Sequence, residues 1–151
     1  AHMKIVRTGG EVVDYYDIRL EYEGFSSIIK CSYLVKNPGP RYSIYGEYGT
    51  FHKWGIDPQE ELLKKGNLPR GENWGTESES EWGTILYEKN GIDFKEKIET
   101  LPGNYNLFYD NVYNAIRNGA ELMVKPEEAI QVLEILEACL ESNKKKKTIY
   151  L

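Results

Sequence analysis

Residues 37–60 read NPGPRYSIYGEYGTFHKWGIDPQE, and this stretch decides the local architecture. Residues that favour strands occupy 41–45 and 50–54, and the four residues between them begin and end with glycine. This pattern predicts two strands joined by a tight turn. Asp57 is a good N-cap residue and Pro58 suits the first helical position, so a helix should follow directly.

Upstream of this stretch, alternation of apolar and polar residues predicts two further strands. Residues 11–23 alternate with period two, which is typical of a strand with one buried face. Gly24 permits a turn into a second strand over 25–35. Ile29 lies on one face of that strand, whereas Ile28 and Leu34 lie on the other, so both faces should be at least partly covered.

Downstream, Asn90-Gly91 is a strong signal for a two-residue hairpin because both residues tolerate positive φ. Apolar residues recur at helical spacing after Asn104 and again after Pro126, and Gly119 ends the first of these two helices. The expected strands are 11–23, 25–35, 41–45, 50–54, 84–89 and 92–99, and residues 148–151 are a further candidate for a short strand. The expected helices are 58–65, 104–118 and 126–143. This order predicts an α+β fold in which helices cover a mixed or mainly antiparallel sheet.

Composition fits one ordinary domain over residues 4–151, with Ala1-His2-Met3 interpreted as a tag remnant. The chain has 151 residues and a net charge of −5, which argues against a nucleic-acid partner. It has no apolar run long enough for a membrane span and no visible signal peptide. Cys31 and Cys139 are far apart in sequence, so we expect reduced cysteines and a cytoplasmic location.

The sequence shows no recognisable motif for nucleotide binding, acid–base catalysis or metal binding. No two of the 14 glycines are two residues apart, so a GxGxxG dinucleotide turn cannot form. Gly66 and Gly71 have P-loop spacing, but the required Lys and Ser or Thr do not follow. His52 is the only histidine outside the tag-like start and has no neighbouring carboxylate in sequence. We therefore expect no catalytic, cofactor-binding or metal site in this chain.

Aromatic residues are abundant, with 12 tyrosines and three tryptophans. Such rings either stack on sugars or pack in cores and interfaces, where they combine a large area with a polar tip. Tyr105, Tyr109 and Tyr113 share one helix face, which favours packing. Trp74 and Trp82 lie in the long loop 66–82, where both alternatives stay open.

The stretch 37–60 closely resembles a segment in the C-terminal domain of the Gfo/Idh/MocA oxidoreductases, nearest to the NADP-dependent scyllo-inositol dehydrogenase-like branch. A second block is similar too: Leu101-Pro102-Gly103-Asn104-Tyr105, Phe108-Tyr109 and Pro126-Glu127-Glu128-Ala129. Lys125 departs from the pattern, because relatives tend to place Thr or a similar N-cap there. The resemblance implies a dihydrodipicolinate-reductase-like domain, with an open mixed, mainly antiparallel sheet and helices on one face. The other sheet face is then expected to pack in a homo-oligomer. It also implies that an N-terminal Rossmann domain, absent from this chain, would bind NAD or NADP.

The resemblance further implies a small polyol or sugar substrate in a cleft beside the turn before residues 41–45. Lys36, Asn37 and Arg41 are the polar residues of this turn and are the candidate substrate-binding residues. In the structural alternative, Pro38 and Pro40 stiffen the turn and Arg41 makes an internal ion pair.

Two classes of function stay open from the sequence. One is the substrate-side and oligomerisation domain of an NAD(P)-dependent oxidoreductase, inactive on its own. The other is a stand-alone carbohydrate-binding or oligomerisation module with no enzymatic parent. The apolar residues on both faces of strand 25–35 predict an oligomer, unless the loop 66–82 covers the second face with Trp74 or Trp82.

Overall fold

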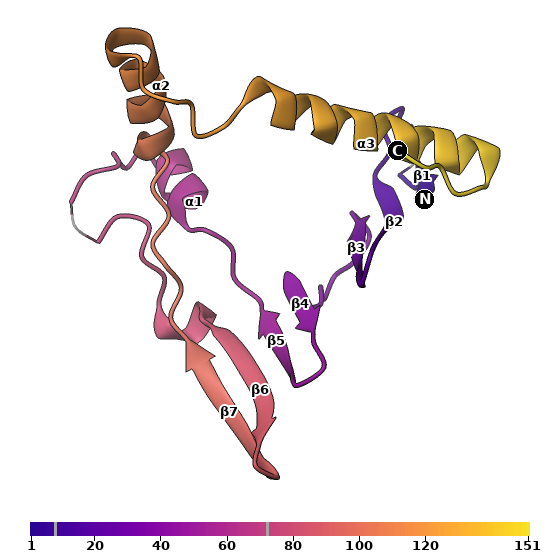
Figure 1. Ribbon diagram of the computed structural model, residues 1–151, viewed down its shortest axis with the longest axis horizontal. Helices are drawn as coiled ribbons and strands as arrows, with labels where there is room; N and C mark the ends of the chain where they lie inside the picture. Colours follow the sequence, from indigo (N-terminus) through magenta and orange to yellow (C-terminus); the bar gives the residue numbers. More distant parts are fainter. Residues whose placement is uncertain (8, 72) are drawn as a thin grey trace. The chain divides into compact units, whose positions relative to one another are not determined.

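The computed structural model describes residues 1–7, 9–71 and 73–151, and it has the α+β class that the sequence predicts (Figure 1). The strands are β1 (His2–Lys4), β2 (Tyr15–Tyr22), β3 (Phe25–Ser32), β4 (Tyr42–Tyr45), β5 (Gly49–Lys53), β6 (Gly83–Lys89) and β7 (Ile92–Ile98). The helices are α1 (Gln59–Lys64), the 3-10 turn η1 (Glu79–Glu81), α2 (Asn106–Asn118) and α3 (Pro126–Lys145).

The chain forms two compact units, each with its own sheet. The first unit holds residues 1–36 and 124–151, and the second holds residues 37–123. The first contains the three-stranded sheet β1-β2-β3 and the second the four-stranded sheet β4-β5-β6-β7. Every strand pairing in the described residues is antiparallel, and the strands group into two sheets where the sequence suggested one.

In the first unit, apolar side chains of the sheet and of α3 surround one hollow. The β2–β3 hairpin pairs Ile18 with Ile29. Among the described residues, the buried apolar side chains are Ile18, 6% exposed, and Cys139 on α3, 5% exposed. Both side chains line the same hollow between the sheet and the helix. Burial on one face of the hairpin explains the period-two pattern that predicted β2.

Both of the first two predicted strands are longer than the strands in the structure, and for β2 the reason is local. Residues 11–14 do not join β2, because the buried carboxylate of Asp14 accepts hydrogen bonds from the backbone N–H groups of Val6, at 2.7 Å, and Arg7, at 3.0 Å. These bonds shape a loop instead of extending the strand. β3 ends at Ser32, before the predicted Val35.

The two ends of the chain also differ from expectation. Residues 2–4 form β1 and pair with β2, although the sequence reading assigned no structure to them. Residues 148–151, the candidate for a further short strand, have no regular secondary structure. No helix among the described residues is long and apolar enough to cross a membrane.

Turn and cap residues in the second unit behave as their chemistry predicts. Asn90 and Gly91 both have positive φ, 56° and 75°, and join β6 to β7 in a two-residue turn. Gly66 follows α1 with φ of +81°, and Gly119 caps α2 with φ of +67°. The N–H of Asn67 reaches the carbonyl of Leu62 at 3.1 Å, which completes the glycine-ended turn of α1.

Helix α3 begins at Pro126 as predicted, with Lys125 as its N-cap. The lysine side chain supplies no capping bond, but the carboxylate of Glu128 accepts from the Lys125 backbone N–H at 2.8 Å. This bond is half of a capping box. It offsets part of what the helix loses by lacking a hydroxyl or amide N-cap.

Candidate functional site

A buried glutamine is the centre of a polar network in the second unit. Gln59, at the start of α1, is 0% exposed. Its side-chain amide donates to Asp57 Oδ2 at 2.8 Å. Its carbonyl oxygen accepts from the indole N–H of Trp74 at 2.8 Å and from the backbone N–H of Tyr105 at 3.0 Å. One side chain thus fixes three segments: the start of α1, the loop 66–82 and the start of α2.

Asp57 has a second role besides the helix cap predicted from the sequence. Its Oδ1 accepts from the backbone N–H of Gln59 at 2.9 Å, as a capping carboxylate does. The helix begins at Gln59 with Pro58 as N-cap, one residue later than expected. The other carboxylate oxygen holds the Gln59 side chain in the network, so the capping signal in the sequence also marked part of this centre.

A largely buried ion pair is a second contact to the loop 66–82, besides the hydrogen bond between Gln59 and Trp74. Lys53 at the end of β5 pairs with Glu77, and their side chains are only 12% and 3% exposed. The lysine also donates to the carbonyl oxygen of Glu81 and to the hydroxyl of Thr100, each at 3.0 Å. Glu77 Oε1 is buried with no hydrogen-bond partner among the described residues. The pair ties β5 to two loops and leaves one acceptor unfilled.

Glycines let these segments approach closely. A Cβ on Gly75 would lie 2.2 Å from the carbonyl oxygen of Gly103, and a Cβ on Gly103 would lie 2.1 Å from Asp57 Oδ2. A side chain at Gly75 would therefore require the backbone of Gly103 to move, and one at Gly103 would displace the side chains of Asp57 and Gln59. Both glycines are thus needed for the close packing around Gln59.

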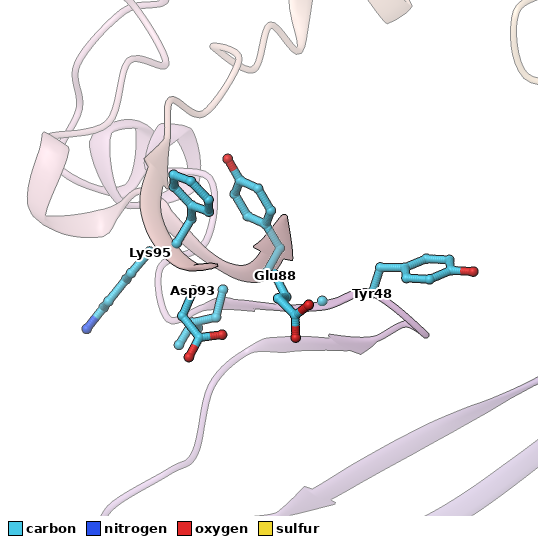
Figure 2. A pocket seen from close by; sticks show the side chains of 8 residues that line it. Tyr48, Glu88, Asp93 and Lys95 are labelled. Atoms are coloured by element: carbon cyan, nitrogen blue, oxygen red, sulfur yellow. The ribbon is translucent and has the colours of Figure 1, made fainter. Parts of the chain in front are cut away.

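A shallow hollow of about 430 Å³ lies over the turn before β5 and the β6–β7 hairpin. Figure 2 shows the carboxylates of Glu88 and Asp93 on the same side of the hairpin, where the two residues are register partners, while the ring of Tyr48 extends away from them. Like charges opposite each other weaken a strand pair.

Beside these carboxylates, the ring of Tyr87 stacks on Phe94, with centroids 5.2 Å apart. The Tyr87 hydroxyl donates to Glu96 Oε1 at 2.7 Å, and this hydrogen bond is the main cause of a raised Tyr87 pKa. The hollow combines an aromatic surface with carboxylates but contains no nucleophile paired with a base.

The three predicted substrate residues lie together on the segment that leads from the first unit to the second. Lys36 is the last residue of the first unit, and Asn37 and Arg41 belong to the second. All three are exposed, in backbone without helix or strand structure. None forms a hydrogen bond or ion pair with another described residue. The internal ion pair considered for Arg41 is therefore not seen among the described residues.

Other candidate groups have structural partners. His52 Nδ1 lies 3.0 Å from the Ser43 hydroxyl, and its ring meets that of Tyr45 edge to face. Cys31 and Cys139 are free thiols. In the part of the chain that the structure describes, no group of three or more His, Cys, Asp or Glu side chains could hold a metal ion.

The buried residues Gln59, Lys53 and Glu77 were not singled out by sequence reasoning. Lone polar residues in a helix, a strand and a loop carry no periodic signal. The one available signal was the Asp57-Pro58 cap, which marked the helix start but not the contacts of the next residue.

Comparison with known proteins gives a consistent set of matches. The sequence model of the C-terminal alpha/beta domain of the GFO/IDH/MocA oxidoreductase family matches residues 6–151. The scyllo-inositol 2-dehydrogenase (NADP(+)) IolW of Bacillus subtilis is 36% identical over 151 residues, covering 100% of this chain and 42% of the relative. The uncharacterised oxidoreductase YdgJ of Escherichia coli is 32% identical, covering 97% of this chain and 42% of its own length.

Solved structures agree with the sequence matches. The oxidoreductase YvaA of Bacillus subtilis superposes with a TM-score of 0.94 at 35% identity, over 99% of this chain and 44% of that protein. An oxidoreductase from Bacteroides fragilis gives a TM-score of 0.90 at 35% identity, over 99% of this chain and 46% of that protein. This chain thus spans less than half the length of the relatives that it matches.

Proposed function

Because the chain belongs to the Gfo/Idh/MocA oxidoreductase family as its C-terminal alpha/beta domain, we propose that it is the substrate-side and oligomerisation domain of an NAD(P)-dependent oxidoreductase. The substrate would be a polyol or sugar of the inositol type. The observation that carries this proposal is the 36% identity to a scyllo-inositol 2-dehydrogenase over all 151 residues. Coverage of only 42% of that enzyme leaves room for a separate nucleotide-binding domain.

In this proposal, NAD or NADP binds an N-terminal Rossmann domain of the same polypeptide. The present sequence cannot build a GxGxxG turn, which such domains use to bring the backbone against a pyrophosphate. The hydride acceptor and the proton-transfer groups would lie on the other domain. This domain alone would then be inactive. The free thiols of Cys31 and Cys139 suit a reducing cytoplasm, where we place the full-length protein.

Lys36, Asn37 and Arg41 are proposed to bind substrate hydroxyls. Lysine and arginine offer only hydrogen-bond donors, whereas an asparagine amide offers both donors and an acceptor. A polyol presents hydroxyl groups that can accept and donate. Their exposure, and the lack of partners among the described residues, leaves these groups available for a ligand.

Exposed apolar residues in both units support the proposed homo-oligomer. On the predicted strand 25–35, Ile28, Ile29 and Leu34 are 55%, 43% and 63% exposed.

The sheet of the second unit has a further apolar face. Tyr42 and Ile44 on β4 share one face and are 49% and 62% exposed. The β-sheet register places Phe51 beside Ile44 and Ile85 beside Phe51, so apolar side chains continue across the same face. Exposed apolar surface of this kind marks an interface, and a two-fold dimer would bury the same patch twice. Light scattering at micromolar concentration measures the molar mass. A monomer mass would contradict the proposed homo-oligomer.

The direct experiment uses the full-length protein that contains this domain. We expect NAD- or NADP-dependent oxidation of scyllo-inositol or a related polyol, followed by the absorbance of the reduced nucleotide. Arg41→Gln should raise KM about tenfold by removing a charged donor, with a smaller change in kcat. Arg70→Gln, at an exposed position in the loop 66–82, is the matched control. Sugar binding with no nucleotide-dependent oxidation would instead favour the stand-alone binding module.

A further inference from the structure

Strand β2 is paired along its whole length on one side only. β3 pairs with all of β2, from Tyr15 to Tyr22. On the other side, the three residues of β1 pair only with Tyr15, Tyr16 and Asp17. Among the described residues, no strand pairs with this edge from Ile18 to Tyr22.

The unpaired part of this edge presents backbone hydrogen-bonding groups. The two-residue turn after β2 makes Tyr22 and Phe25 the closing pair of the hairpin. Backbone groups alternate in direction along an antiparallel strand, so Ile18, Leu20 and Tyr22 bond toward β3. The N–H and C=O groups of Arg19 and Glu21 therefore face the open edge. An edge of this kind is a template for one more strand.

The space beside this edge has the size and lining for an extended segment. A hollow of about 820 Å³ lies between β2, α3 and the tail 146–151. Its lining includes both Arg19 and Glu21 at the strand edge, and the apolar side chains of Ile18, Leu20 and Cys139. A strand placed here could bury alternate side chains against α3 while its backbone pairs with β2.

The chain enters this hollow through β1, in the extended conformation that such a strand needs. The N–H of Met3 donates to Asn143 Oδ1 at 3.0 Å, and the amino group of Ala1 donates to Ser142 Oγ at 2.8 Å. Both donors point to α3, as expected for alternate residues of one straight strand. The register pairs His2 with Asp17, so a residue before Ala1 would lie opposite Arg19, and the third residue before Ala1 opposite Glu21. Figure 1 shows β1 and both chain ends beside α3.

We infer that Ala1-His2-Met3 belong to the natural chain, in place of the tag remnant considered above, and that in the full-length oxidoreductase the residues leading into β1 continue it along Ile18–Tyr22 as an edge strand of this sheet. The inference rests on the proposed function, because that function requires a preceding nucleotide-binding domain. The connection between the domains is then a paired strand and not a flexible linker. Residues opposite each other in a sheet share a face. The second residue before Ala1 should therefore be apolar, because it shares the α3 face with Leu20.

Hydrogen exchange on the full-length protein tests this strand directly. We expect the amides of Arg19 and Glu21 to exchange about a hundredfold more slowly in the full-length protein than in the 151-residue chain. The amide of Leu20, which bonds to β3, should be protected in both. Equal and rapid exchange of Arg19 and Glu21 in the two proteins would overturn the inference.

A proline substitution provides a second measurement. Proline is tolerated on an edge strand where its missing N–H would face away from the sheet, but not within a sheet. Arg19→Pro should therefore lower Tm clearly more in the full-length protein than in the 151-residue chain. Leu20→Pro, the matched control, should destabilise both. An equal effect of Arg19→Pro in the two proteins would count against the added strand.

Other occupants of the edge give different results, each of which would overturn the inference. Protection that appears in the 151-residue chain and rises with concentration would identify a second copy. Protection lost on removing residues 148–151 would identify the C-terminal tail.

The strand and the proposed function can fail separately. Nucleotide-dependent oxidation by a full-length protein whose Arg19 and Glu21 amides are unprotected would reject the added strand but leave the proposed function standing. Protected Arg19 and Glu21 amides in a full-length protein that oxidises no polyol would reject the proposed function but leave the added strand standing.

Discussion

The two units of this domain differ in the side chains that they bury: among the described residues, the first unit buries both apolar and polar side chains, whereas the second buries polar ones. In the first, the buried apolar side chains are Ile18 on β2 and Cys139 on α3, and both line one hollow between the sheet and the helix. In the second, the fully buried side chain is the polar Gln59, and a Lys53–Glu77 ion pair holds the long loop. Both arrangements order the chain, but they respond differently to substitution.

Apolar contacts lose stability in proportion to the atoms that are removed, whereas a buried polar network fails when one member is lost. The remaining partners are then buried without hydrogen bonds, and each pays the full desolvation cost. We therefore expect single substitutions to be more damaging in the second unit than in the first.

The largest effect should come from breaking the buried ion pair. Lys53→Met leaves the carboxylate of Glu77 buried without its charge partner, and should lower the free energy of unfolding by about 4 kcal/mol. Denaturant titration measures this loss. The control is Lys89→Met, at an exposed lysine of the same sheet. The double variant Lys53→Met with Glu77→Leu should recover most of the loss. A double variant as unstable as the single one would show that charge burial is not the cause.

The next effect should come from the glutamine centre. Gln59→Leu keeps a similar side-chain size but leaves the Trp74 indole and the Tyr105 amide without their acceptor. We expect a loss of about 3 kcal/mol in the free energy of unfolding, since each buried unpaired group costs about 1–3 kcal/mol. The Trp74 fluorescence should shift as its hydrogen bond is lost. Gln131→Leu, at an exposed position on α3, should leave both measurements unchanged.

A smaller loss should follow from trimming the apolar contact of the first unit. Ile18→Val removes one methyl group from the buried face and should cost about 1 kcal/mol. Val132→Ala on α3 is a control of similar size, because Val132 is 56% exposed. If Ile18→Val destabilised the protein as much as Gln59→Leu, the contrast between the units would be wrong.

The smallest effect concerns the titration of Tyr87. Its hydrogen bond to Glu96, together with some desolvation and the nearby negative charge, raises the pKa of the phenol. The interaction favours the protonated phenol, so its contribution to stability is present below the ordinary tyrosine pKa and is lost as pH rises through the raised value. Glu96→Gln should move part of the phenolate absorbance to lower pH. Glu99→Gln, at an exposed residue, should not; an unchanged titration of Glu96→Gln would contradict the hydrogen bond.

Local signals in the sequence predicted much of the fold. Asn90-Gly91, Gly119 and Pro126 each fix a turn or a helix end through their own backbone preferences, and each lies where expected. The boundary of β2 was missed because Asp14 bonds to Val6 and Arg7, a contact that has no period in the sequence.

The polar centre was less predictable than the fold. Gln59 contacts residues 15 and 46 positions away, and Lys53 contacts Glu77 across 24 positions. Only the folded chain brings these residues together, so spacing within one segment cannot reveal them. For Lys36, Asn37 and Arg41, the substrate role stays a prediction, and it depends on the KM of the Arg41 variant.

The first unit is discontinuous, since residues 1–36 and 124–151 flank the whole of the second. On a ribosome that builds the chain from its N-terminus, the β2–β3 hairpin emerges long before α3, which must cover Ile18. At typical synthesis rates this interval is on the order of ten seconds, and the second unit can fold within it. The hairpin would meanwhile expose a bare apolar face, which makes the nascent chain a candidate client for a holding chaperone until its last helix is complete.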